Sequence, residues 1–260
     1  RGAAGLADGT TVTVDVADPA GCGRFVARVL RGVDPGAASP AWLQQRLTAL
    51  GMRPISALVD ISNYVMLELG QPNHPYDLAK VGGATLRVRK AAAGEKMVTL
   101  DDVERTCTVD DLLITDGHDV PVGIAGVMGG ADCEISSTTT EVLLEMAWFD
   151  PTSISRTSRR LGLRSEASAR FEKGVDPAIA ELAADRFCQL AGEICGATAE
   201  PVQVDVRGTL PSRPPAAAAQ RSLPRAPRPG RTASRQVLRN GAPDHAGRAH
   251  RPPSRAGSRT

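Results

Sequence analysis

Apolar residues near the start of the chain recur first with the spacing of strands and then with that of a helix. Residues 10–16 alternate Thr or Asp with Val, which is the period of a half-buried strand, and residues 24–33 form a second predicted strand. A helix is predicted next, with Ser39 as N-cap, Pro40 at its first position and Gly51 at its end. Its predicted buried stripe is Leu43, Leu47 and Leu50.

A second helix is predicted over residues 56–69, with Gly70 at its end. Its apolar stripe is Leu58, Ile61, Val65 and Leu69. Asn63 lies off this stripe, at an interior position where Asn is a poor helix former. Residues 71–75, QPNHP, hold two prolines that flank His74, so we expect a rigid loop there.

The central third of the chain is rich in predicted strands. They are residues 84–90, 97–100, 105–109, 112–115, 120–124 and 142–149. The last of these, VLLEMAWF, predicts a strand that is buried on both faces. Helices are predicted to begin at Asp150-Pro151 and at Asp176-Pro177, and the apolar stripe of the second is Ile179, Leu182, Ala183, Leu190 and Ile194, before Gly196. The pattern predicts an α+β fold with a strand-rich, β-sandwich-like core flanked by helices.

Charge divides the chain near residue 207. Eleven of the 31 basic residues but only one of the 29 acidic residues lie after it, so residues 1–207 carry 28 acidic against 20 basic side chains. Residues 207–260 are rich in Arg, Pro and Ala without periodicity, which predicts disorder. A basic tail can contact RNA phosphates, but this composition is more typical of a GC-rich coding sequence read in a shifted frame. The chain also begins without Met, and we expect a fragment or an incomplete gene product.

Other compositional features favour a cytoplasmic protein. The five cysteines are odd in number and form no CxxC motif, which is typical of reduced thiols. No apolar run approaches the roughly 20 residues of a membrane helix, so no membrane association is expected. No metal-ligand spacing and no ATP-binding motif occurs, so we expect no metal and no cofactor in this chain.

Glu145 is the sharpest candidate for chemistry, because it stands among apolar neighbours. A buried carboxylate costs several kcal/mol unless it is hydrogen-bonded or paired. Either a nearby Arg holds Glu145, or it accepts a hydrogen bond from a ligand. His74 is a further candidate, although a lone His is more often structural.

Small residues and a basic cluster accompany these candidates. The glycines at 123, 126, 129 and 130 predict tight turns in a sheet. The segment 164–177, RSEASARFEKGVDP, has small residues where a ligand could fit, and the Ser165 hydroxyl could equally belong to a loop or an N-cap. The basic cluster is either a solvated helix face or a phosphate contact, and comprises Arg156, Arg159, Arg160, Arg164, Arg170 and Lys173.

Four blocks of sequence together resemble the editing module of the bacterial phenylalanyl-tRNA synthetase beta subunit. They are residues 63–77 (NYVMLELGQPNHPYD), the glycine-rich turn 123–130, the strand around Glu145, and RSEASARFEKGVDP. The resemblance runs over about residues 10–206. It implies a partial N-terminal (B1-like) segment over residues 1–50 and a B3/B4 editing domain over 51–206, before the tail of 207–260.

The resemblance also implies an activity, which is hydrolysis of mischarged tyrosyl-tRNA(Phe) by water. Glu145 would accept a hydrogen bond from the tyrosine hydroxyl, while His74 and Asn63 would position the ester or the water. Further substrate-binding positions would be Ala125, Gly126, Gly129, Ser165 and Ala167, with RNA contacts from Arg156, Arg159, Arg160 and Arg164. The implied partners are tRNA(Phe) and the alpha subunit of a heterotetramer, and the whole synthetase would use ATP and magnesium outside this chain.

Two other functions stay open on the sequence. The same region could be a scaffold or RNA-binding module whose pocket is idle. It could also be a stand-alone deacylase that acts without an alpha subunit.

Overall fold

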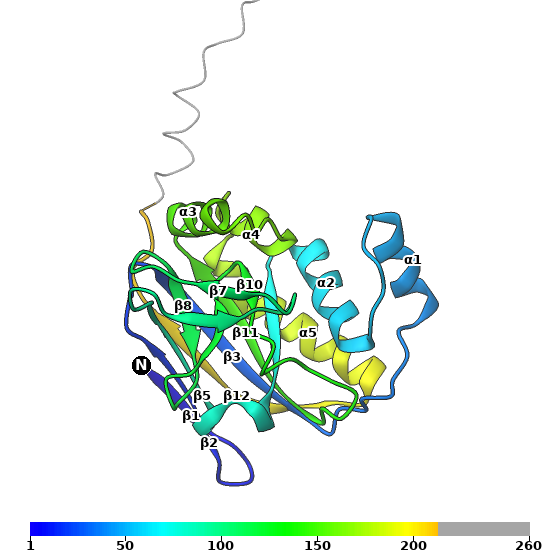
Figure 1. The fold of residues 1–260 in the computed structure, drawn as a ribbon. Coiled ribbons are helices and arrows are strands. Elements are labelled where there is room, and N and C mark those ends of the chain that lie inside the picture. The colour runs from blue at the N-terminus through cyan, green and yellow to red at the C-terminus, as the bar shows by residue number, and fades with distance from the viewer. Residues whose placement is uncertain (213–260) are drawn as a thin grey trace, which may run out of the picture. The chain divides into compact units, whose positions relative to one another are not determined.

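Two β-sheets face each other in the computed structural model, which describes residues 1–212 (Figure 1). The six-stranded sheet has the order β1 (Gly2–Gly5), β2 (Thr11–Val16), β5 (Thr85–Lys90), β8 (Leu112–Thr115), β9 (Pro121–Ile124) and β10 (Met128–Gly129). The four-stranded sheet has the order β12 (Thr198–Arg207), β3 (Cys22–Arg31), β11 (Glu141–Phe149) and β4 (Asn73–Asp77). A short hairpin pairs β6 (Lys96–Val98) with β7 (Glu104–Thr106). The predicted sandwich-like core is therefore confirmed.

Helices cover the outer face of the four-stranded sheet and one end of the sandwich (Figure 1). The α-helices are α1 (Ala41–Ala49), α2 (Ala57–Leu69), α3 (Pro151–Leu161), α4 (Glu166–Phe171) and α5 (Ala180–Cys195), and the 3-10 turns are Leu78–Lys80, Gly82–Ala84 and Pro177–Ile179. In a second apolar core, α5 packs on β3 and β11, α2 packs on α5 and β4, and α1 packs on α2. The α+β prediction is confirmed.

The central strands β3 and β11 contribute to both cores, because successive side chains of a strand point to opposite faces. On β11, Leu143 and Ala147 lie between the sheets, whereas Leu144 and Met146 pack against the helices. The prediction that this strand is buried on both faces is confirmed. Glu145 lies two residues from Leu143 and two from Ala147 on the same strand, so its side chain points to the same face, into the space between the sheets.

The segment predicted as a rigid loop at residues 71–75 is instead a strand from residue 73 onward. β4 lies at the edge of its sheet and pairs antiparallel with β11. An edge strand tolerates Pro75, because its free edge requires no hydrogen-bond donor there. The prolines exclude a helix but do not exclude this strand.

Two details of the predicted helices are also wrong. Helix α1 is capped by Pro40 rather than by Ser39, whose hydroxyl donates instead to Asp60. Leu50 and Leu182 are 62% and 59% exposed, so each falls outside the buried stripe to which it was assigned.

Three further elements are present that the sequence pattern does not indicate. Strand β1 pairs with β2, helix α4 occupies residues 166–171, and β12 pairs with β3 through a register shift between Ala199 and Gln203. The predicted disordered tail begins too early, since residue 207 ends β12 and the N–H groups of Gly208 and Thr209 donate to Gly23 and Pro19. The rest of that prediction, from residue 213, lies outside the described residues.

Residues 1–212 form one compact unit in which strands from 1–50 pair with strands from 51–206. The boundary at residue 50 concerns divisions within the family and stays a prediction. No helix within residues 1–212 is long and apolar enough to cross a bilayer. All five cysteines are free thiols.

Candidate functional site

The register between β4 and β11 places three polar side chains in one row. Glu145 is the direct partner of His74, and Leu143 is the partner of Tyr76. Residues that face each other across an antiparallel pair point to the same side of the sheet, as do residues two apart on one strand. His74, Tyr76 and Glu145 therefore share the face that looks toward the six-stranded sheet.

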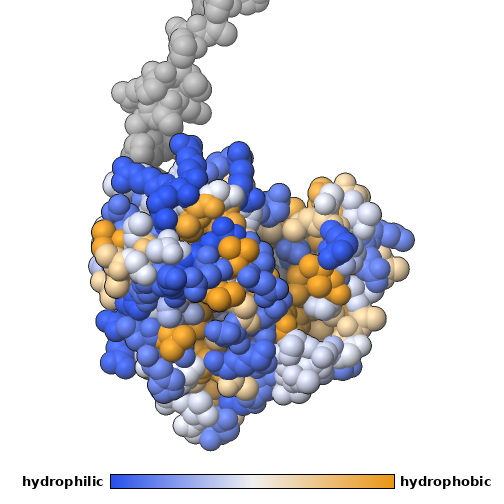
Figure 2. Space-filling view, in the orientation of Figure 1, coloured by the Kyte–Doolittle hydropathy of each residue, from blue (hydrophilic) through white to orange (hydrophobic). Residues whose placement is uncertain are grey.

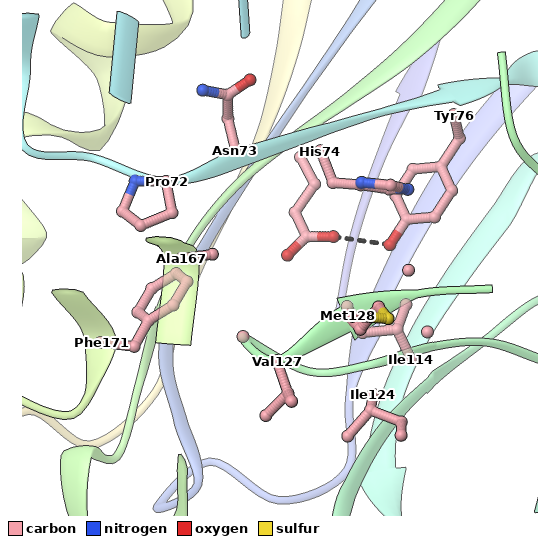
Figure 3. Close-up of a pocket in the computed structure, with 14 residues that line it drawn as sticks. Pro72, Asn73, His74, Tyr76, Ile114, Ile124, Val127, Met128, Ala167 and Phe171 are labelled. Carbon is pink, nitrogen blue, oxygen red and sulfur yellow. Dashed lines mark hydrogen bonds between the residues drawn. The ribbon is translucent and has the colours of Figure 1, made fainter. Parts of the chain in front are cut away.

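Glu145 is buried, with 5% of the residue exposed, and its single hydrogen bond comes from a neutral donor. The Tyr76 hydroxyl donates to Glu145 Oε2 at 2.7 Å, drawn as the dashed line in Figure 3. Within residues 1–212, no Lys or Arg forms an ion pair with this carboxyl, which removes the interpretation of a Glu held by Arg. Burial raises the pKa of Glu145 from 4.5 to about 7, and the hydrogen bond from Tyr76 opposes this rise.

The His74 imidazole packs between Tyr76 and the backbone of Gly129. Its ring centroid lies 4.4 Å from that of Tyr76, at 75° between the planes. A Cβ atom on Gly129 would lie only 2.5 Å from His74 Cε1, so the ring requires glycine at that position. His74 Nε2 is enclosed and has no hydrogen-bond partner among the described residues, and burial lowers the pKa of His74 from 6.5 to about 4. The imidazole is therefore neutral at pH 7.

The turn between β9 and β10 forms the opposite wall of the site. Gly126 has φ +66°, and a Cβ there would approach Phe171, Ile154 and Phe149 to about 3.0–3.1 Å. The Gly126 N–H donates to none of residues 1–212, whereas the N–H of Ala125 donates to the Leu112 carbonyl. The turn thus leaves the Gly126 N–H without a partner among these residues, and Gly126 lines the same cavity as Glu145.

These groups line a small inner cavity of about 70 Å³. Figure 3 shows His74 and Tyr76 together on their strand, with Met128 and Ile124 across from them and Phe171 at the far side. The remaining lining residues are Pro72, Asn73, Ile114, Gly123, Gly126, Val127, Gly129, Glu145 and Ala167. The cavity is thus mainly apolar with one acid, which is a common composition of ligand sites.

A larger outer groove of about 560 Å³ adjoins the inner cavity. The two share part of their lining, namely Asn73, His74, Val127, Met128, Gly129 and Ala167. One wall of the groove is apolar and comprises Met52, Ile55, Val59 and Met66, and the hollow beside α2 shows hydrophobic side chains in Figure 2. Its charged lining residues are Asp101, Glu134 and Glu166, and none is basic. The groove therefore suits an uncharged or cationic group better than a phosphate.

Asn63, predicted to be catalytic, and three of the predicted substrate-binding residues separate into three groups by the cavity that each lines. Ala167 lines both cavities, and Asn63 of α2 lines only the outer groove. Ser165 also lines the groove, and its hydroxyl caps α4 by accepting from Ser168 N–H and donates to the Val127 carbonyl at 2.8 Å. It thereby fixes α4 to the glycine turn. Ala125 is buried in the core and lines neither cavity.

The predicted RNA-binding arginines lie on and beside α3, where hydrophilic residues gather in Figure 2. Arg156 and Arg159 are exposed and line a shallow hollow of their own. Arg160 is bound to the buried Asp111, and Arg164 lies 3.5 Å from Glu172 but stays 75% exposed. The structure thus leaves Arg156, Arg159 and Arg164 accessible and commits Arg160 to an internal contact.

Sequence reasoning missed two polar residues of the site, Tyr76 and Asn73. The Asn73 amide donates to the Ser62 carbonyl at 3.1 Å and so ties β4 to α2. Period-two spacing from His74 would have indicated Tyr76, had residues 73–77 been recognised as a strand. Among residues 1–212, no group of three or more His, Cys, Asp or Glu is arranged to hold a metal ion.

Comparisons with known proteins agree on one family. A model described as "B3/4 domain" matches residues 21–196. The chain is 54% identical over 190 residues to the phenylalanine--tRNA ligase beta subunit of Streptomyces avermitilis, covering 72% of this chain and 23% of that protein. It is 50% identical over 209 residues to the same subunit of Nocardia farcinica, covering 80% and 25%. The chain thus spans about a quarter of the length of these relatives.

One solved structure is similar in part. It is an N-terminal fragment of the phenylalanyl-tRNA synthetase beta-subunit from Pyrococcus horikoshii, with a TM-score of 0.47 and 10% sequence identity. The match covers 77% of this chain and 55% of that chain.

Proposed function

The chain belongs to the B3/4 domain family, in the form found in phenylalanine--tRNA ligase beta subunits, and from this premise we propose that its inner cavity serves to hydrolyse tyrosyl-tRNA(Phe). The observation that carries the proposal is a buried carboxyl in a mainly apolar cavity, whose Oε1 accepts no hydrogen bond from residues 1–212. Such a group is unfavourable without a ligand, because a buried charge requires hydrogen-bond partners.

The chemistry of Glu145 fits a phenol. A tyrosine side chain in the cavity would donate its hydroxyl hydrogen to Glu145 Oε1 and accept from the Gly126 N–H. Phenylalanine can do neither, so it would leave both groups without a ligand partner. Sites that hydrogen-bond a substrate hydroxyl reject the analogue without it by up to about 10⁴–10⁵. This selects the wrong amino acid for hydrolysis and spares the right one.

The outer groove would hold the ester and the terminal ribose. Asn63 and His74 border it, and a neutral imidazole can orient a water molecule or the ester carbonyl by hydrogen bonding. We assign Asn63 and His74 a positioning role and water the role of nucleophile. Phosphates would lie outside, near Arg156 and Arg159.

The larger assembly follows from the relatives and is part of the proposal. The chain would act within a cytoplasmic ligase that pairs a beta subunit with an alpha subunit and binds tRNA(Phe). Aminoacylation, with its ATP and magnesium, would take place outside this chain.

The test uses the ligase assembled with a beta subunit that carries this sequence as its B3/4 region. Hydrolysis of preformed tyrosyl-tRNA(Phe) is measured for wild type, Glu145→Ala and the control Glu68→Ala. Glu68 also accepts a tyrosine hydroxyl, at 2.9 Å, but lines neither cavity. Loss of a hydrogen bond to a charged group is worth about 1.5–3 kcal/mol, so Glu145→Ala should lower kcat/KM about 10- to 100-fold.

The control variant should hydrolyse at the wild-type rate. Unchanged hydrolysis in Glu145→Ala would refute the assignment and favour a scaffold whose pocket is idle. Turnover by the 260-residue chain alone, above the spontaneous rate, would instead indicate a stand-alone deacylase.

A further inference from the structure

Tyr76 belongs to the row of polar side chains on β4 and β11, yet the proposed reaction assigns it no role. It is 1% exposed and lines the inner cavity. Its ring packs against His74, and its hydroxyl donates to Glu145 Oε2 at 2.7 Å. One side chain thus contacts both residues that would meet the substrate.

The hydrogen bond from Tyr76 makes the two carboxyl oxygens of Glu145 different from each other. Oε2 is occupied by Tyr76, while Oε1 receives no hydrogen bond from any of residues 1–212. A carboxylate that is fixed through one oxygen cannot rotate freely about its last side-chain bond. The free acceptor that Glu145 presents to the cavity therefore has a set direction.

We propose that Tyr76 is a positioning residue that determines specificity: its hydroxyl holds Glu145 Oε2, so that Oε1 faces the phenol of a ligand in the inner cavity. The inference rests on the proposed function, because it assigns Tyr76 a role in the same site. It also makes a claim about Glu145 that can be tested in the chain without any substrate.

The surroundings of Glu145 make its protonation sensitive to this one hydroxyl. Among the residues that line the inner cavity, the ionisable groups besides Glu145 are His74 and Tyr76, both on β4. From β3, the buried Cys22 thiol is close enough for Glu145 to help raise its pKa, and this thiol stays neutral. Burial also raises the pKa of Tyr76, so its hydroxyl remains a donor at every pH of interest. Removing that donor raises the pKa of Glu145 further, because the hydrogen bond lowers it.

Tyr64 offers a matched control for Tyr76. The chain has two tyrosines, and both donate a hydroxyl to a carboxylate, but Tyr64 contacts Glu68 on α2 and lines neither cavity. Carbon-13 NMR of the 260-residue chain, labelled at the glutamate carboxyl carbon, follows the Glu145 resonance, which is assigned by its loss in Glu145→Gln. Tyr76→Phe should move its titration midpoint upward, and Tyr64→Phe should leave it unchanged.

Kinetics in the assembled ligase supply the second measurement. Tyr76→Phe should raise KM for tyrosyl-tRNA(Phe) about tenfold with kcat changed less than twofold, and should shift the pH profile of KM upward. A wild-type midpoint and pH profile in Tyr76→Phe would overturn the inference. If wild-type ligase does not hydrolyse tyrosyl-tRNA(Phe) at all, the proposed function fails, while the NMR titration still decides the role of Tyr76.

A nearly isosteric replacement guards against a folding defect in Tyr76→Phe. Substituting 3-fluorotyrosine for Tyr76, the one tyrosine that remains in a Tyr64→Phe background, makes its hydroxyl a more acidic and hence stronger donor. The Glu145 midpoint should then move downward. A midpoint that does not move, or moves upward, would contradict the proposal.

Discussion

Replacing Glu145 with Gln should stabilise the protein at alkaline pH and not at acidic pH. Glutamine keeps a carbonyl oxygen that can accept from the Tyr76 hydroxyl, but it cannot ionise. In the native protein burial raises the pKa of Glu145 from 4.5 to about 7. Each pKa unit corresponds to about 1.36 kcal/mol, so the ionised side chain costs the native state on the order of 3 kcal/mol.

The sign of this pH dependence of stability follows from proton linkage. Between pH 4.5 and 7 the native state binds more protons at Glu145 than the unfolded state does, so its contribution to the free energy of unfolding falls as pH rises. His74 acts in the opposite direction, because burial lowers its pKa from 6.5 to about 4 and its contribution is lost as pH falls through that range. In wild type the pH dependences that Glu145 and His74 contribute to the free energy of unfolding nearly cancel between pH 4.5 and 6.5.

Glu145→Gln removes the contribution of Glu145 and keeps that of His74. The measured quantity is therefore the difference in free energy of unfolding between this variant and wild type. It should grow by about 3 kcal/mol in favour of the variant from pH 4.5 to pH 8, which corresponds to a difference in Tm on the order of 10 °C. Urea unfolding of the 260-residue chain, followed by circular dichroism at several pH values, gives this difference.

Glu68→Gln is the matched control, since Arg186 and Tyr64 hold the pKa of Glu68 below its ordinary value. Its difference from wild type should have the opposite sign, with the variant less stable at pH 8. A Glu145→Gln difference that is constant between pH 5 and 8 would show that this carboxyl is not enclosed, and the picture of the site would be wrong.

Three further predictions concern the turn and the basic surface. Gly126→Ala should lower the free energy of unfolding by about 1–3 kcal/mol more than Gly94→Ala in urea titrations, because both have positive φ but only the first meets side chains. Gly129→Ala should displace the imidazole that faces it and lower kcat for deacylation more than tenfold, while the cavity still selects tyrosine over phenylalanine; an unchanged kcat would contradict the assigned role of the imidazole. Replacing Arg156 and Arg159 together by Glu should raise KM for tyrosyl-tRNA(Phe) with kcat unchanged, and a KM insensitive to salt in wild type would refute the phosphate contact.

The sequence predicts elements best where local signals decide them. Strand β8 occupies the predicted residues 112–115, and α2 ends at Gly70, whose φ of +71° favours glycine. Helix α4 is too short, at six residues, for its apolar spacing to be recognised. Strand β12 is obscured by Pro201 and by the register shift beside it.

The candidate site could be predicted in part for a similar reason. An acid within an apolar run is visible in the sequence, and so is a histidine between prolines. The partner of that acid is not visible, because Tyr76 and Glu145 lie 69 residues apart and meet only through strand pairing. The choice between Arg and a neutral donor as the partner therefore required the structure.

The β4–β11 register also explains why the acid lies in the cavity. Side chains of a strand alternate between its faces, so a shift of one residue would place Glu145 in the helix-covered core and bring Leu144 between the sheets. Leu144 and Met146 are completely buried against the helices, and this burial opposes such a shift. The apolar neighbours that make Glu145 conspicuous in the sequence are thus the residues that hold it opposite His74, and the site depends on their packing as much as on the acid itself.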